Sequence, residues 1–406
     1  MFRRIVVDNF KSFKHAEFNL TEGNIGRANN MALLFGANGG GKSNIMYSII
    51  FLKESLKTLA DRGVDVRQMA EVSRNWGSDG NMSMEYSFSN GAEDGEYLLE
   101  FDSENRLVRE KLDYTINKNT GNIFDIRIED GMRMCEFSRQ LFKTALFRDI
   151  MENDIEKWWG DHTFLSIIFK QASESRKEYL SEMLGTGILG VVKYIDDIQV
   201  CRPGMDNMGC GLFKYDPFEG VVPRGDARSI EKFADVAGFF ISSTYDDIVG
   251  IDLESWIDGN MMHYRMNVVR EFDGERYVCP AKKECTGVKE ALRILPALMC
   301  CANGGTALVD NIEFGLHEAV LKNIFDNCLA GISGQLITAS TATILLENSN
   351  PHHVFVVKDG TVTPFPQIER TQKNHNNRNR YLKGVFGALP EPAPVDLCEL
   401  SEQFMK

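Results

Sequence analysis

A glycine-rich run near the start of the chain carries residues suited to phosphate chemistry. The sequence from Gly36 to Ser43 reads G-A-N-G-G-G-K-S, which matches the phosphate-binding pattern G-x-x-x-x-G-K-S/T. Glycines let backbone N–H groups turn toward phosphate oxygens, the lysine reaches the outer phosphates, and the serine hydroxyl suits Mg²⁺. We predict that a nucleoside triphosphate binds through Gly36, Ala37, Asn38, Gly39, Gly40, Gly41, Lys42 and Ser43.

The residues on both sides of this run provide the elements that the motif needs. Met31 to Phe35 is apolar and predicts a buried strand, and Asn44 to Leu59 carries the apolar spacing of a helix. A strand, a glycine-rich loop and a helix in this order form the context in which the pattern holds phosphate. An accidental glycine-rich turn would lack both flanks.

Composition limits the classes of protein to which this chain can belong. Its 406 residues suffice for two or three lobes. With 45 Lys and Arg against 58 Asp and Glu, the net charge of −13 does not indicate a surface that coats DNA. The nine cysteines form no C-x-x-C pair, and the sequence shows neither a secretion signal nor a long apolar run. We therefore expect a soluble cytoplasmic protein with reduced thiols and no membrane partner.

The period of the apolar residues changes along the first half of the chain. Four short runs with alternating apolar residues begin at Met82 and predict an antiparallel β meander. Helical spacing follows from about Met132 to Val200. Within this helical insertion we expect Trp158 and Trp159 to pack in the core.

Turn-forming residues mark the next part of the chain. Residues 201–228 are rich in Gly, Pro, Asp and Met and predict a long loop. A helix and a β-hairpin closing at Asp273 and Gly274 follow. The predicted division is an N-terminal lobe at 1–130, a mainly helical insertion with the returning hairpin at 131–280, a C-terminal lobe at 281–390 and a tail at 391–406.

A strand far along the chain supplies a carboxylate for the phosphate loop. The run T-A-L-V-D at 306–310 is apolar until its last residue, Asp310. A loop of this kind needs a distant carboxylate to hold Mg²⁺ beside its serine hydroxyl. We therefore predict that Ser43 and Asp310 hold the Mg²⁺ of a bound ATP.

Four further motifs give the chain a resemblance to a known class of ATPase. They are N-F-K-S-F from Asn9, E-C-T-G-V-K from Glu284, L-V-D-N-I-E-F-G-L-H from Leu308 and Y-L-K-G-V-F-G-A-L-P from Tyr381. Together with the phosphate loop they resemble ABC-type P-loop ATPases of the SMC, RecF and OLD class, and most of all the compact prokaryotic AAA_15/AAA_21 ATPases of abortive infection and phage defence. The resemblance spans nearly the whole chain and implies an α/β fold, an ABC-type P-loop NTPase head with an antiparallel β subdomain and a helical insertion.

The resemblance assigns a role to the segment that precedes the Asp310 strand. Thr286, Gly287 and Lys289 occupy the ABC signature position, which in such families caps the γ-phosphate held by a second protomer. A hydroxyl, a glycine N–H and a helix N-terminus all suit an anion. The alternative is an ordinary helix cap. If the signature role holds, two copies of the chain pair around two nucleotides.

Two departures from the family pattern concern catalysis. Asn311 stands where the family has the glutamate that polarises the attacking water, and an amide orients water but cannot accept its proton. Glu313 replaces that glutamate only if the turn brings its side chain to the phosphate. Thr341 stands where the family has a histidine, and a hydroxyl carries no charge at neutral pH. We expect a weak ATPase in which Glu313 and Asn311 position water and the hydroxyl of Thr341 senses the phosphate.

Three functions remain open from the sequence. The resemblance implies a nucleotide-dependent dimer, or a higher oligomer, that acts as sensor or scaffold of an antiphage defence system and controls a partner effector such as a nuclease. A RecF-like ATPase for DNA repair or DNA ends is an alternative that needs a basic face on the head. A nucleotide-locked scaffold without turnover is the third possible function. The phosphate loop grips only phosphates, so ATP and GTP are not distinguished.

Overall fold

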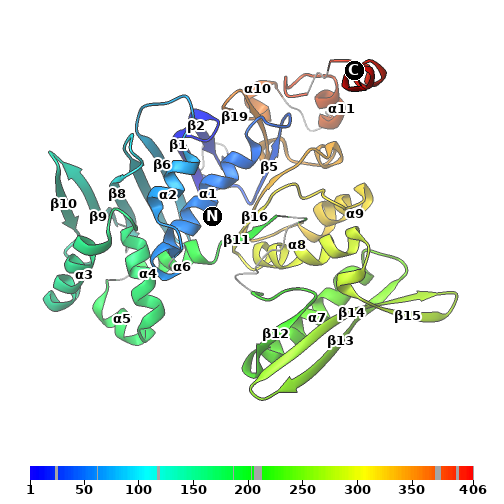
Figure 1. The fold of residues 1–406 in the computed structure, drawn as a ribbon, viewed down its shortest axis with the longest axis horizontal. Helices are drawn as coiled ribbons and strands as arrows, with labels where there is room; N and C mark the ends of the chain where they lie inside the picture. The colour runs from blue at the N-terminus through cyan, green and yellow to red at the C-terminus, as the bar shows by residue number, and fades with distance from the viewer. Residues whose placement is uncertain are drawn as a thin grey trace.

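Two large sheets, one smaller sheet and the helices that pack against them organise the chain (Figure 1). The computed structural model describes residues 1–22, 26–61, 63–116, 119–185, 187–202, 204, 213–370, 376–389 and 393–405.

A mostly parallel sheet carries the phosphate loop near its centre. Its strand order is β11-β16-β17-β5-β18-β19, and only the last pair is antiparallel. The strands are β5 (Met31–Phe35), β11 (Gln199–Cys201), β16 (Thr306–Val309), β17 (Gln335–Ala339), β18 (Val354–Lys358) and β19 (Thr361–Pro364). The predicted strand before the phosphate loop is thus β5, and its two neighbours come from the last quarter of the chain. Parallel pairing brings the carboxyl ends of strands from distant parts of the sequence to one edge.

An antiparallel sheet of order β10-β9-β8-β7-β6-β1-β2 forms a second layer. The strands are β1 (Phe2–Phe10), β2 (Phe13–Asn19), β6 (Met82–Asn90), β7 (Glu93–Phe101), β8 (Leu107–Ile116), β9 (Asn119–Glu129) and β10 (Met132–Phe137). The predicted meander is confirmed, but the helical spacing predicted from Met132 was wrong for β10. This strand lies at the sheet edge with nearly all its side chains exposed, so its sequence shows no buried face.

Helix α1 (Lys42–Asp61) packs between the two large sheets, with α2 (Val66–Ser73) beside it. The ring of Phe51 on α1 meets the rings of Phe10 and Phe101 edge to face in the antiparallel sheet. On its other side α1 contributes Ile45 and Ile49 to a core shared with Leu34 and Ile337 of the parallel sheet. The helix that follows the phosphate loop is therefore held from both sides.

The predicted helical insertion comprises α3 (Ala145–Trp158), α4 (Phe164–Glu174), α5 (Lys177–Met183) and α6 (Ile188–Asp196). It shares one core with the antiparallel sheet, and Figure 1 shows it beside that sheet. Trp159 is buried and Trp158 packs against the same core, so their predicted packing role is confirmed. The buried carboxylate of Glu110 on β8 joins the parts, because it accepts hydrogen bonds from Tyr97, from the Trp159 indole and from the backbone N–H groups of Phe164 and Leu165.

The smaller sheet lies at the far end of the molecule from these helices (Figure 1). It contains β12 (Glu219–Pro223), β13 (Ile248–Asp258), β14 (Met261–Phe272) and β15 (Glu275–Pro280), with β14 pairing to the other three. The hairpin predicted at Asp273 and Gly274 is confirmed, and both residues have positive φ, 51° and 80°. The loop predicted at 201–228 was wrong for its last part, which holds β12 and the start of α7 (Ala227–Ser242). Positions 203 and 205–212 of that loop lie outside the described residues.

The smaller sheet and α7 share their core with α8 (Thr286–Ala302), not with α3 to α6. The segment predicted as one insertion therefore packs against two different cores, and the division into lobes stays a prediction. The remaining elements are short. They are β3 (Thr21–Glu22), β4 (Arg27–Ala28), η2 (Arg224–Asp226), η3 (Ala281–Lys283), α9 (Glu318–Asn323), η4 (Ile324–Cys328), η5 (Thr343–Leu346), η6 (Pro351–His353), α10 (Phe365–Ile368), α11 (Asn377–Leu382) and α12 (Leu397–Met405).

The topology confirms the predicted fold class. The chain is an α/β protein with a phosphate loop between β5 and α1, an antiparallel β subdomain and a helical insertion. Among the helices of the described residues, none is both long and apolar enough to cross a membrane.

Candidate nucleotide site

The phosphate loop connects the end of β5 to the start of α1 and depends on its glycines. Gly36 has a φ of 152°, and a Cβ there would lie 2.3 Å from the carbonyl oxygen of Val357 on β18. Gly41 has a φ of 101°, and a Cβ there would lie 2.9 Å from Ser12 Oγ. Between them Asn38 and Gly39 are exposed. Close contact with the β18 backbone at one end and with the Ser12 side chain at the other therefore fixes the loop, while its tip faces solvent.

Lys42 is buried under the loop that it is predicted to serve. Its ammonium group donates to the carbonyl oxygens of Gly36 at 2.7 Å and Ala37 at 3.1 Å. Burial lowers the pKa of Lys42, and the nearby charges of Glu313 and Asp310 act in the opposite direction. The cation is thus within electrostatic reach of both carboxylates that the sequence places in the site.

Ser43 and Asp310 meet although 267 residues separate them. Ser43 Oγ donates a hydrogen bond to Asp310 Oδ1 at 3.1 Å. They meet because β17 pairs with both β5 and β16, so the ends of these strands lie side by side. Mg²⁺ prefers oxygen ligands and usually takes one or two from protein, with waters and phosphates completing its octahedron. A hydroxyl beside a single carboxylate fits that pattern, and the described residues form no cluster of three or more metal-binding side chains.

The turn after β16 places Asn311 and Glu313 differently. Asn311 adopts a left-handed conformation with a φ of 53°, which asparagine tolerates better than most residues. Its side chain is exposed. Glu313 turns inward, and its Oε1 accepts two hydrogen bonds of 2.8 Å from the backbone N–H and the hydroxyl of Thr341. Its Oε2 is buried and has no hydrogen-bond partner in the described structure.

The structure therefore brings Glu313 and Thr341 into direct contact, which the sequence did not indicate. Among the residues that the structure describes, no donor meets the second carboxylate oxygen, and the charge of Glu313 acts on Lys42 at the phosphate loop. A carboxylate in this state is able to accept a hydrogen bond from a water molecule or another donor that enters the site.

The signature segment begins α8 at an exposed helix end. Cys285 occupies the N-cap position without a capping side chain, and Thr286 after it is exposed, while Gly287 and Lys289 are half-buried. A Cβ on Gly315, in the turn after β16, would lie 2.7 Å from the Thr286 side chain. In the part of the chain that the structure describes, no hydrogen bond or ion pair joins this segment to the phosphate loop.

An arginine that the sequence did not single out anchors the signature segment. Arg270 on β14 forms a two-pronged ion pair with Glu284, through Nε at 3.0 Å and Nη2 at 2.7 Å, and also contacts Asp247. This guanidinium lowers the pKa of the Glu284 carboxyl below its ordinary value. Arg270 carries no sequence signal, because its role appears only when β14 lies beside the start of α8.

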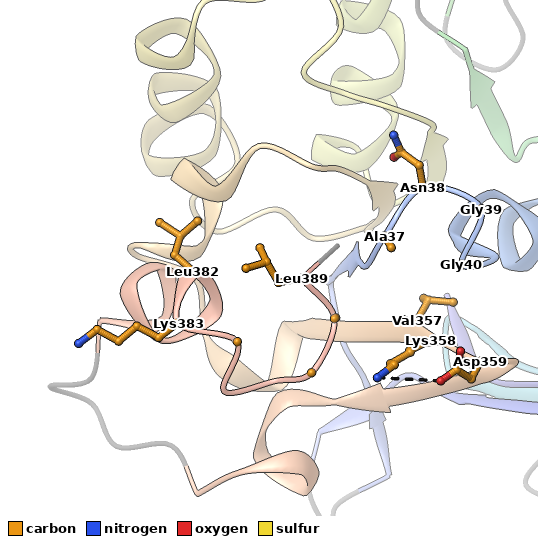
Figure 2. Close-up of a pocket in the computed structure, with 13 residues that line it drawn as sticks. Ala37, Asn38, Gly39, Gly40, Val357, Lys358, Asp359, Leu382, Lys383 and Leu389 are labelled. Atoms are coloured by element: carbon orange, nitrogen blue, oxygen red, sulfur yellow. Dashed lines mark ion pairs between the residues drawn. The ribbon is translucent and has the colours of Figure 1, made fainter. Parts of the chain in front are cut away.

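A cavity of about 750 Å³ opens at the tip of the phosphate loop (Figure 2). One wall is the loop itself from Ala37 to Gly40, and another is the end of β18 with Lys358 and Asp359. The third wall is the segment from Leu382 to Leu389, which belongs to the motif that begins at Tyr381. The C-terminal motif therefore lies against the phosphate loop, except for Pro390, which is outside the described residues.

Comparisons with known proteins give only distant likenesses. No protein-family model matches the chain, and no curated protein matches it significantly. A solved SMC head bound to the C-terminal winged-helix domain of ScpA aligns with 14% identity and a TM-score of 0.45, over 89% of this chain and 96% of that one. An SMC head with an extended coiled coil, bound to the C-terminal domain of ScpA derived from Pyrococcus furiosus, aligns with 11% identity and a TM-score of 0.43, over 89% of this chain and 95% of that one. The SMC head domain from Thermotoga maritima aligns with 12% identity and a TM-score of 0.41, over 89% of this chain and 98% of that one.

Proposed function

We propose that this chain binds ATP with Mg²⁺, pairs with a second copy around the nucleotide, and hydrolyses it slowly. The observation that carries the proposal is the contact of Ser43 with Asp310 beside Lys42. A phosphate loop, a lysine and a hydroxyl–carboxylate pair assembled from opposite ends of the chain are the parts that a magnesium-bound triphosphate requires.

Each residue of the site has a defined task in this proposal. The backbone N–H groups from Gly36 to Gly41 and the start of α1 hold phosphate oxygens. Lys42 leaves the carbonyl oxygens of Gly36 and Ala37 and moves to the outer phosphates. Ser43 and Asp310 hold the metal ion, which when bound neutralises negative charge on the phosphates.

Slow hydrolysis follows from the turn after β16. Asn311 supplies an amide that orients water but takes no proton, and Glu313 supplies a carboxylate that, like Asp310, lies within electrostatic reach of Lys42 and is able to act as a base. The two hydrogen bonds from Thr341 hold the Glu313 side chain two residues beyond the position where the family has its base. A misplaced general base reduces turnover by as much as about 10²- to 10⁴-fold.

Pairing follows from the position of the signature segment. Thr286, Gly287 and Lys289 lie at an exposed helix end suited to an anion, yet in the described residues no hydrogen bond or ion pair joins them to the phosphate loop of the same chain. A second copy, turned to face the first, would bring this helix end to the exposed tip of the loop at Asn38 and Gly39. The site would then be complete only in the dimer.

The experiment is ATP binding, phosphate release and mass, each measured on the purified chain with and without ATP. Lys42→Ala should abolish ATP binding, whereas Lys57→Ala on the same helix should keep it. Glu313→Gln should bind ATP, accumulate as the paired form and lose turnover. If Lys42→Ala binds ATP as well as the unaltered chain, the proposed site is wrong. If ATP binds without changing the mass, the pairing is wrong.

The biological setting that the sequence resemblance suggests is antiphage defence, with the paired form controlling an effector such as a nuclease. This setting rests on the resemblance alone. A direct test is to express the chain with its neighbouring genes in bacteria and compare phage plaque counts with those of the Lys42→Ala version. Equal plaque counts would remove the defence role and leave the ATPase proposal intact.

A further inference from the structure

A second cavity, of about 400 Å³, adjoins the phosphate loop on the side of the antiparallel sheet. Its walls are the turn between β1 and β2 with Lys11 and Ser12, the start of α1 at Asn44, and the segment after α2 with Asn75 and Trp76. Asn44 directly follows Ser43 and donates a hydrogen bond to Ser12 Oγ at 2.8 Å. The cavity therefore begins where the phosphate-binding residues end.

The side chain of Trp76 at this cavity is fully exposed. The other tryptophans have partners: Trp159 is buried, Trp158 packs against the core, and the ring of Trp256 stacks on His263 with centroids 5.1 Å apart. A large aromatic ring left in water loses the burial that would stabilise it, and a flat ligand could restore that burial. Trp76 is thus placed to cover such a ligand in the cavity.

Hydrogen bonds fix the walls that carry Trp76. Asn75, its chain neighbour, donates from its backbone to Asn9 O at 2.8 Å and from its side chain to Lys11 O at 2.7 Å. Lys11 in turn donates two hydrogen bonds, from its backbone N–H to Ser73 O at 2.7 Å and from its ammonium group to Val72 O at 2.6 Å. The N-F-K-S-F turn and the segment before Trp76 therefore form one connected structure beside the phosphates.

We propose that this cavity receives the nucleobase of the bound triphosphate and that Trp76 stacks on the face of the base. The inference rests on the proposed nucleotide site. The cavity at the loop tip is the other place for the base, but none of the described residues that line it is aromatic. Asn44 and Asn75 each donate one amide hydrogen within the protein, and the ring of Trp76 is the aromatic surface at the cavity, so we expect the stacking area of the base to select it more than its hydrogen-bonding edge.

This arrangement predicts a definite order of affinities. Purines stack over a larger area than pyrimidines, so ATP and GTP should bind alike and CTP more weakly. Inorganic tripolyphosphate, which has no base, should bind weakest, and only through the phosphate loop. Stacking of one base on an aromatic side chain is worth a factor of about 5 to 150 in affinity.

The test measures binding of ATP, GTP, CTP and tripolyphosphate, all with Mg²⁺, to the full chain and to Trp76→Ala, Trp76→Phe and Trp256→Ala. Trp76→Ala should weaken ATP and GTP about 5- to 150-fold and leave tripolyphosphate unchanged. Trp76→Phe should recover most of the loss, and Trp256→Ala, which alters an exposed tryptophan on β13, should change nothing.

Two results would overturn the inference. Unchanged ATP affinity in Trp76→Ala would show that the base lies elsewhere, as would an equal loss for ATP and tripolyphosphate. Lys42-dependent binding of tripolyphosphate would show in either case that the phosphate site itself stands. If the unaltered chain binds neither ATP nor tripolyphosphate, the proposed function fails and this inference fails with it.

Discussion

Substituting Gly36 by alanine tests whether the phosphate loop depends on its contact with β18. The new Cβ would lie 2.3 Å from Val357 O and 3.3 Å from Val357 C. The obstacle is backbone of a strand that pairs with β5, so no side chain can rotate away to make room. The φ of 152° at Gly36 also lies in a region that residues with a Cβ rarely adopt.

The size of the effect follows from these two terms. Forcing one extra carbon into a packed site costs about 1 to 3 kcal/mol. A sparsely populated backbone conformation adds about 1 to 3 kcal/mol. The free energy of unfolding should therefore fall by about 2 to 6 kcal/mol. Displacement of the loop should also weaken ATP binding, because its backbone N–H groups would no longer point at the phosphate oxygens.

The assay is urea unfolding of Gly36→Ala beside Gly39→Ala, with ATP binding measured for both. Gly39 has a φ of 81°, but nothing lies within 4 Å of its Cβ position. The control therefore bears only the backbone strain, about 1 to 2 kcal/mol. Equal stability of the two variants would refute the reasoning, because it would mean that β18 yields to the extra carbon at no cost.

Three further changes have defined outcomes. Burial raises the pKa of Glu110 from 4.5 to about 7, so the folded chain keeps a proton that the unfolded chain has lost between these values. The free energy of unfolding should fall by up to about 3 kcal/mol as the pH rises from 4.5 to 7. Urea titrations of Glu110→Gln should show a smaller dependence of this free energy on pH. The same pH dependence in the variant and the unaltered chain would contradict this. Arg270→Met should release Glu284 and reduce ATP-dependent pairing at least about tenfold. ATP binding to the single chain, measured at low protein concentration, should persist. Pairing that is unaltered in mass measurements would exclude the anchoring role. Thr341→Val should slow single-turnover phosphate release about tenfold, because Glu313 loses one of the two hydrogen bonds that hold it, while ATP affinity is retained. An unchanged or faster rate would count against this coupling.

Tertiary structure overrode local pattern at two places. The run from Met132 to Phe137 lies on an exposed edge, where neither face is buried, so the sequence carried no alternation to mark a strand. Residues 219–223 form β12 because they pair with β14, although the surrounding composition is that of a loop. Pairing with a distant strand supplies the hydrogen bonds that decide such segments, and no local window contains it.

Local patterns in the chain are enough to predict several parts of the candidate site. The glycine-rich loop, its flanking strand and helix, and the carboxylate that ends an apolar strand at Asp310 follow from spacing and period within short segments. Which of these parts meet depends on the tertiary structure. The contact of Ser43 with Asp310, the hold of Thr341 on Glu313 and the placement of Trp76 beside Asn44 depend on strand order and on turns far apart in the chain. Sequence periodicity encodes which face of a segment is buried, whereas its partner is chosen by the packing of the whole molecule.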